Sequence, residues 1–165
     1  MTIHTFISFK QYVKLIYRLT YGKPFMKIIV GAGLLIASWV IGWYAGINLP
    51  KPAYYHYVTL SLIFVAQPAL IYMTIRRSYR SSNHLQEHLE IVFIADLIKI
   101  KGESFYMELN WNNMYKITEL KKWFLIYQNT LSAILLPKES FKKNTPDEFR
   151  SLAKSFKGPV IKLKE

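Results

Sequence analysis

Residues 28–50, IIVGAGLLIASWVIGWYAGINLP, and residues 53–75, AYYHYVTLSLIFVAQPALIYMTI, contain no Asp, Glu, Lys or Arg. As a helix, the part of the first stretch before Pro50 is roughly 33 Å long, and the hydrocarbon core of a bilayer is about 30 Å thick. The two stretches therefore predict membrane-spanning helices at about residues 28–49 and 53–75, joined by a tight hairpin at Asn48–Pro52. A cleaved signal peptide is disfavoured, because the first stretch is too long and begins too far into the chain.

Charge is distributed unevenly around these stretches. All ten Asp and Glu residues lie from Glu87 onward. One cation, Lys51, lies in the hairpin, whereas eight flank the two spans: Lys10, Lys14, Arg18, Lys23, Lys27, Arg76, Arg77 and Arg80. By the positive-inside rule, this asymmetry predicts a multi-pass protein of the bacterial cytoplasmic (inner) membrane with both termini in the cytoplasm. Basic charge beside apolar spans is unlike the basic patch of a nucleic-acid-binding domain, so we expect no nucleic acid as a partner.

A polar dipeptide, Gln67-Pro68, interrupts the second span. Because proline has no N–H group, the backbone carbonyl near Phe64 loses its usual donor, which predicts a helix kink at Gln67 and Pro68. The favoured interpretation is a kink whose polar groups bond to the neighbouring helix, and the alternative makes Gln67 a transport or binding residue. Neither span contains a charged residue, which argues against a pump or an ion-coupled transporter.

Residues 1–24 precede the first span and divide into two predicted elements. Residues Thr2–Ile7 alternate loosely in polarity, which predicts a strand added to the cytoplasmic domain. Ser8 is a typical N-cap for the helix that follows. The cations of this helix, Lys10, Lys14 and Arg18, lie on one side of the helix, and its apolar residues lie on the opposite side. The pattern predicts an amphipathic helix that lies at the anionic cytoplasmic leaflet.

From Ser82 onward the hydrophobic period changes from helical to alternating. Five or six short strands at close spacing are predicted, as in an antiparallel meander, from the runs at residues 88–93, 97–101, 105–109, 114–120, 123–128 and 131–136. A single helix then begins at Thr145-Pro146-Asp147-Glu148, which supplies an N-cap, a proline at the first helical position and the glutamate of a capping box. Residues 82–165 therefore predict an α+β domain, in which an antiparallel sheet or half-barrel is closed by one C-terminal helix.

Loosely spaced residues accompany this order of elements: Trp111, Ile117, Glu119, Phe124, Tyr127, Pro137, Lys138, Phe141 and Thr145 to Phe149. In these residues and in the order of its elements, the chain resembles the YcxB-like family of bacterial membrane proteins. The resemblance covers most of the chain. It implies two spans followed by a cytoplasmic domain like a pleckstrin-homology-type barrel. It implies an architecture rather than an activity, because the family has no settled biochemical role.

The sequence contains no recognisable catalytic site. There are no cysteines, which excludes disulfides, Cys-based zinc sites and Cys nucleophiles. His84 and His88 would lie about 13 Å apart on a strand, too far to share one metal. No GxSxG turn or glycine-rich phosphate loop is present. Glu103, Glu108 and Glu119 lie among lysines and are predicted to form surface ion pairs. We therefore expect no cofactor, no metal and no enzymatic activity.

Basic residues form the main candidate site. The proposed lipid-binding or partner-binding surface consists of Lys10, Lys14, Arg18, Lys121, Lys122, Lys138, Lys142 and Lys143. A basic rim on a domain tethered to the membrane is suited to anionic lipid headgroups. The simpler interpretation is that these side chains only solvate a small domain beside a negatively charged leaflet.

The function hypothesis that follows is an integral inner-membrane accessory or regulatory protein. Its cytoplasmic domain would bind a protein partner or anionic lipid headgroups, and the chain would contact membrane lipids and possess a protein partner or form a homo-oligomer. The alternative is a membrane immunity or resistance factor that acts through the transmembrane hairpin. A third hypothesis, an enzyme with an unrecognised site at the membrane edge, has little support in the sequence.

Overall fold

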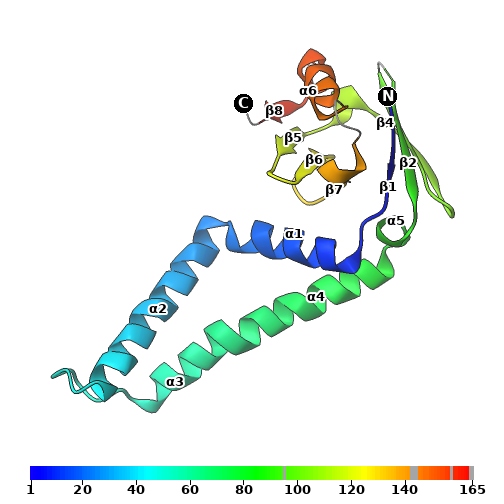
Figure 1. Ribbon diagram of the computed structural model, residues 1–165. Coiled ribbons are helices and arrows are strands. Elements are labelled where there is room, and N and C mark those ends of the chain that lie inside the picture. The colour runs from blue at the N-terminus through cyan, green and yellow to red at the C-terminus, as the bar shows by residue number, and fades with distance from the viewer. Residues whose placement is uncertain (95, 142–144, 157, 164–165) are drawn as a thin grey trace. The chain divides into compact units, whose positions relative to one another are not determined.

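The computed structural model describes residues 1–94, 96–141, 145–156 and 158–163 (Figure 1). The chain divides into two compact units. The helical unit comprises Ser8–Ser82, and the β unit combines Met1–Ile7 with Asn83–Glu165. The helical unit is therefore inserted, in sequence, between the first strand of the β unit and the rest of it.

Two long apolar helices dominate the helical unit. Helix α2 spans Pro24–Tyr44, and a second continuous helix consists of α3 (Tyr54–Ser61), η1 (Leu62–Ala66) and α4 (Gln67–Ser81). By length and composition, α2 and the helix Tyr54–Ser81 are each able to cross a membrane. The helices approach closely at Gly33, where an added Cβ would lie 3.1 Å from side-chain atoms of Ile63 and Phe64.

The Gln67-Pro68 dipeptide produces a change of helix type. The five residues before it, Leu62–Ala66, are π-helical, and the N–H of Gln67 donates to the carbonyl of Leu62, five residues back. A π turn of this kind accommodates a proline that cannot donate to the carbonyl four residues earlier. The Gln67 side chain donates from Nε2 to Sδ of Met26 on α2, at 3.0 Å, whereas its Oε1 atom is buried without a hydrogen-bond partner among the described residues.

Helix α1 (Phe9–Tyr21) begins at Ser8 in a capping box with Gln11, as the sequence predicts for its start. Its aromatic residues pack on α4: the Phe9 ring contacts Tyr79 edge-on, with centroids 5.3 Å apart. Farther along α1, the Tyr17 hydroxyl donates to the backbone carbonyl of Pro68 at 2.7 Å. Part of the apolar side that the sequence assigns to the lipid surface is thus occupied by α4.

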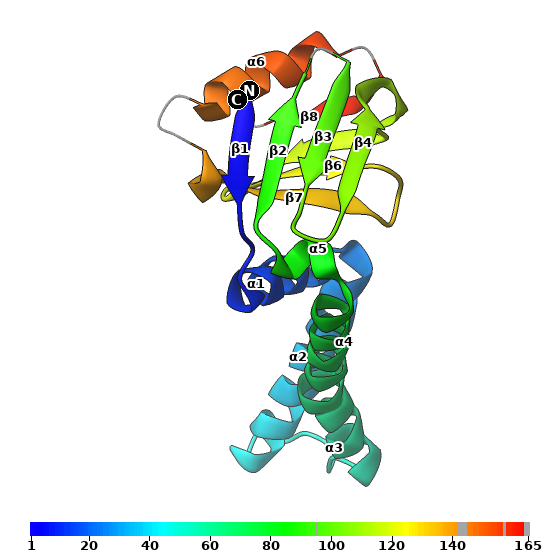
Figure 2. The same cartoon turned by 90° about the vertical axis from the view of Figure 1, so that its right-hand side faces the viewer.

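The β unit contains two four-stranded sheets (Figure 2). Sheet A has the order β1-β2-β3-β4, with β1 at Thr2–Thr5, β2 at Leu89–Phe93, β3 at Leu97–Lys101 and β4 at Tyr106–Asn110. Sheet B has the order β7-β6-β5-β8, with β5 at Lys116–Glu119, β6 at Trp123–Tyr127, β7 at Ala133–Pro137 and β8 at Val160–Lys162. All pairings are antiparallel except the parallel pair β5 and β8.

These sheets differ from the single meander that the spacing of the strands suggests. The connection from β4 to β5 is the short helix η2 (Trp111–Asn113) rather than a hairpin turn, so the ladder breaks there and a second sheet begins. The predicted N-terminal strand is present as β1 and pairs with β2. Strand β8 follows Gly158-Pro159 and has no counterpart among the strands that the sequence predicts.

The core lies between the two sheets and under α6 (Thr145–Ser155). Phe149 of α6 is fully buried. Its ring contacts Phe93 of sheet A, with centroids 5.4 Å apart, and Phe124 of sheet B, at 4.7 Å. Trp111 stacks on Phe156 at 4.1 Å. Aromatic contacts therefore connect α6, the C-terminal helix that the sequence predicts, to both sheets.

Candidate functional site

The outward face of sheet A carries a row of polar side chains from three neighbouring strands. The strand register aligns His4 of β1 with Glu90 of β2, and Glu90 with Lys101 of β3. These residues alternate along their strands with buried ones such as Ile91 and Ile100, so they share the face opposite the core. An imidazole, a carboxylate and an ammonium group thus lie on neighbouring strands of one sheet face.

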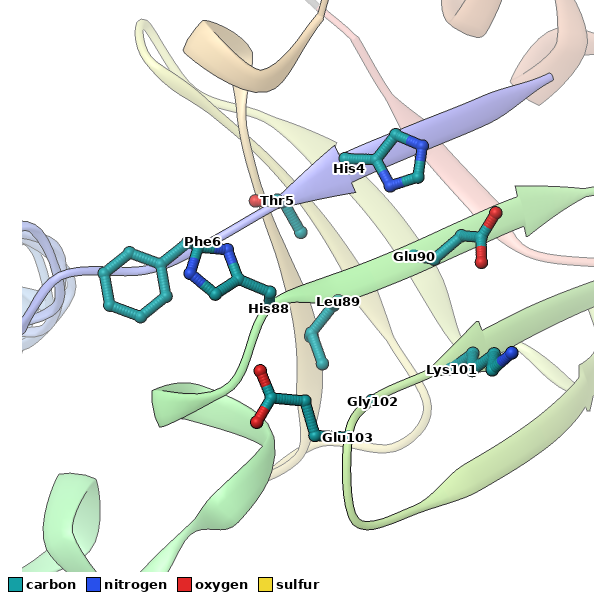
Figure 3. Close-up of a pocket in the computed structure, with 9 residues that line it drawn as sticks. All are labelled: His4, Thr5, Phe6, His88, Leu89, Glu90, Lys101, Gly102 and Glu103. Atoms are coloured by element: carbon teal, nitrogen blue, oxygen red, sulfur yellow. The ribbon is translucent and has the colours of Figure 1, made fainter.

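A groove of about 440 Å³ runs along this row (Figure 3). Phe6, just after β1, stacks on the imidazole of His88, with ring centroids 4.8 Å apart and planes inclined by 24°. Phe6 is 43% exposed, so a large apolar ring remains open to solvent at the groove. Glu103 lies on the opposite side, in the turn between β3 and β4. The groove therefore combines an aromatic surface with charges of both signs.

The turn beside the groove is held by a carboxylate. Glu87 accepts hydrogen bonds from the backbone N–H groups of Glu103, at 2.7 Å, and Ser104, at 2.9 Å, and from the Ser104 hydroxyl. Because these bonds favour the ionised form, with the Ser104 hydroxyl making the largest contribution, the pKa of Glu87 lies below its ordinary value. Gly102 leaves room for this contact, since an added Cβ would lie 2.7 Å from Oε2 of Glu87.

A second ordered cluster continues the same face on β3 and β4. Lys99 pairs with Glu108 at 3.0 Å, and the Tyr106 hydroxyl also donates to Glu108. The hydrogen bond from Tyr106, followed by the bond from Lys99, lowers the pKa of Glu108. The prediction of surface ion pairs is confirmed for Glu108, whose side chain is 41% exposed.

That prediction is wrong for Glu119, whose side chain is only 1% exposed. Its carboxylate accepts two hydrogen bonds from Arg150 of α6, from Nε at 3.0 Å and from Nη2 at 2.7 Å. It also accepts one from Lys138, at the start of the short helix η3 (Lys138–Ser140). Arg150 in turn pairs with Asp147, and these acceptors raise its pKa, Glu119 most strongly. The arrangement joins β5, the end of β7 and α6.

A signal for the burial of Glu119 was present in the sequence. Glu119 lies two residues after Ile117, and residues i and i+2 of a strand share one face. Ile117 faces the core, so Glu119 must point inward as well. From the sequence alone, the neighbouring Lys121 and Lys122 suggest that Glu119 belongs to a solvated turn. The burial of Glu119 can be inferred only when Ile117 is known to face the core.

The predicted basic surface is only partly assembled within the β unit. Lys121 and Lys122 are exposed in the turn between β5 and β6, whereas Lys138 contacts Glu119 and lies over the Phe124 ring, 4.8 Å from its centroid. Lys142 and Lys143 lie outside the described residues. In the helical unit, the cations of α1 are all exposed along one stripe: Lys10, Lys14 and Arg18.

A different basic group lies at the end of α4. Arg76, Arg77 and Arg80 line an open groove of about 740 Å³ together with the apolar residues Leu70 and Met73. The sequence identified these arginines as orientation signals and not as a site. Among the described residues, no three His, Asp or Glu side chains gather closely enough to hold a metal ion.

The fold and these surfaces define a class of protein: an α+β domain of two sheets and a core helix, with two apolar helices inserted after its first strand. The family model described as YcxB-like protein matches residues 95–153, from two residues before β3 into α6. The match includes the residues of the Glu119 ion cluster, Lys138, Asp147 and Arg150 among them. No curated protein and no solved structure matches the chain.

Proposed function

We propose that the chain is an integral protein of the bacterial cytoplasmic membrane with both termini in the cytoplasm. The lengths and apolar compositions of α2 and the helix Tyr54–Ser81 support two spans, and the flanking cations support this orientation. The sheet pairing adds an independent argument. Because β1 precedes the helical unit and β2 follows it, their pairing requires both ends of that unit to lie on one side of the membrane. An even number of spans satisfies this requirement.

The β unit is proposed to be a variant of the pleckstrin-homology-type barrel. The support is its two small antiparallel-rich sheets with a C-terminal helix whose Phe149 packs against both. In this proposal the first strand is separated from the second by the inserted membrane hairpin. Each sheet on its own is an open one, with β1 and β4 at the edges of sheet A.

The biochemical role that we propose is that of a non-catalytic accessory or regulatory subunit, which recognises a protein partner through the groove on sheet A. The observation that carries this proposal is the half-exposed Phe6 ring, stacked on His88 beside an ordered row of opposite charges. Aromatic anchors surrounded by complementary polar groups are typical of protein–protein interfaces. A groove with both Glu90 and Lys101 is less suited to an anionic membrane surface, which favours cations alone.

The proposal is tested by site-specific photo-crosslinking of the full-length protein in its native membrane. A photo-reactive amino acid at His4, inside the groove, is expected to capture a defined protein, and Phe6→Ala is expected to abolish that product. Leu131 provides the matched control, because it is a 96% exposed apolar residue in the turn between β6 and β7. Capture at Leu131 with equal yield, or insensitivity to Phe6→Ala, would contradict the groove as the binding surface.

The membrane assignment has a separate test. The protein is expected to remain in the membrane pellet after extraction with alkaline carbonate, which releases peripheral proteins. A protease applied to the outer side of sealed cells is expected to leave the β unit intact. Release by carbonate would overturn the membrane assignment without reference to the groove.

A further inference from the structure

We infer that the arginine groove at the end of α4 binds the phosphate headgroup of an anionic phospholipid. The groove is defined by Leu70, Met73, Thr74, Arg76, Arg77 and Arg80. The inference rests on the proposal that the helix Tyr54–Ser81 spans a membrane. It goes beyond that proposal because it assigns a bound lipid to a particular set of side chains in the helical unit.

The groove has two chemically distinct ends. The apolar end consists of Leu70 and Met73, which are 63% and 64% exposed and lie nearer the middle of the proposed span than the arginines do. Arg77 follows Met73 by four residues and Arg80 by seven, so the apolar and cationic side chains follow one face of the helix. A ligand that occupies the groove must therefore offer an apolar tail at one end and an anion at the other.

The charges of Arg76 and Arg77 are not neutralised within the helical unit. Residues Ser8–Ser82 contain nine Lys and Arg and no Asp or Glu. Among the described residues, no ion pair involves Arg76 or Arg77. Adjacent guanidinium groups without a carboxylate repel one another, and a bound phosphate relieves this repulsion.

The residue type points to phosphate. A guanidinium presents a planar set of N–H donors that matches two phosphate oxygens, whereas a lysine acts as a point charge. The positive-inside rule is satisfied equally by lysine. The described cations that line the groove at the end of α4 are all arginines, whereas the exposed stripe on α1 consists of Lys10, Lys14 and Arg18. The two basic groups of the helical unit therefore allow a direct comparison.

Native mass spectrometry of the full-length protein in detergent micelles tests the inference. The protein would be titrated with phosphatidylglycerol and, separately, with phosphatidylcholine. We expect selective retention of phosphatidylglycerol, and no displacement by an equal concentration of inorganic phosphate, because phosphate lacks the tail that contacts Leu70 and Met73. Equal binding of the two lipids, or full displacement by inorganic phosphate, would overturn the lipid site.

Two triple variants locate the site. Arg76→Lys, Arg77→Lys and Arg80→Lys together retain the charge, and thus the membrane orientation, but lose the paired donors. We expect this variant to bind phosphatidylglycerol about tenfold more weakly, which corresponds to one lost charge-assisted hydrogen bond. The control removes the α1 stripe through Lys10→Gln, Lys14→Gln and Arg18→Gln, and should change the affinity less than twofold.

An unchanged affinity in the lysine variant would show a diffuse charge effect and refute the arginine site. An equal loss of phosphatidylglycerol affinity in the α1 variant would also refute the arginine site. Circular dichroism verifies that each variant retains its helices. Because a protein that resists carbonate extraction can still lack selectivity for phosphatidylglycerol, failure of this inference is distinguishable from failure of the membrane assignment.

Discussion

Glu119→Gln is the most informative substitution in the β unit. The change retains the size of the side chain but removes the negative charge with which both Lys138 and Arg150 form ion pairs. Breaking a fully buried ion pair destabilises a protein by about 3–5 kcal/mol. Here the side chains of Lys138 and Arg150 are 20% and 31% exposed and retain contact with water, so the loss is smaller. We expect a decrease of about 2 kcal/mol in the free energy of unfolding of the β unit.

Urea titration of the full-length protein in a mild detergent measures this effect. The fluorescence of Trp111 and Trp123, both buried in the β unit, reports its unfolding, and the midpoint and slope yield the free energy. Asp147→Asn is the control, because Asp147 also contacts Arg150 but is 78% exposed, and its loss should change stability by less than about 0.5 kcal/mol. The reasoning is refuted if Glu119→Gln unfolds at the same urea concentration as the wild type, or if both variants lose equal stability.

Two further predictions concern the turn between β3 and β4. Because the bonds from Ser104 lower the pKa of Glu87 in the folded protein, this group stabilises the fold above its ordinary pKa of 4.5, and the contribution is lost as the pH falls through the folded value. Urea titrations between pH 3 and pH 6 should show this dependence in the wild type and a weaker one in Glu87→Gln; identical profiles would contradict it. Gly102→Ala should destabilise the protein by about 1–3 kcal/mol, because the new Cβ would lie 2.5 Å from the Phe105 ring. Gly31→Ala, which meets no atom within 4 Å, is the control, and equal losses would exclude a steric cause.

Local patterns predicted most individual elements correctly. The strands of β2 and β3 agree with their alternation of apolar and polar residues, and α1 begins at the Ser8 cap that the sequence contains. These successes share a physical cause. Helix capping and the alternation of a half-buried strand depend on residues within a few positions of one another, so they can be read without knowledge of the rest of the chain.

The candidate groove was not predictable in the same way. Phe6 lies in a segment that resembles any short alternating strand, and its partner His88 is on the other side of the helical unit in sequence. The sequence assigns Lys138 to a basic binding surface, whereas in the structure this lysine contacts the buried Glu119. A basic residue near a turn is a surface charge or an ion-pair partner depending on what the fold places beside it.

Apolar length, charge asymmetry and strand periodicity are therefore properties of the sequence alone, and by themselves they predict two long apolar helices and an α+β domain. Contacts between distant residues determine the rest. The pairing of β1 with β2, the parallel addition of β8 to β5 and the burial of Glu119 under Arg150 all join segments that are remote in sequence. Such pairings depend on which strand edges and charges the folded chain brings together, and the hydrophobic period of a single segment carries no information about its partner.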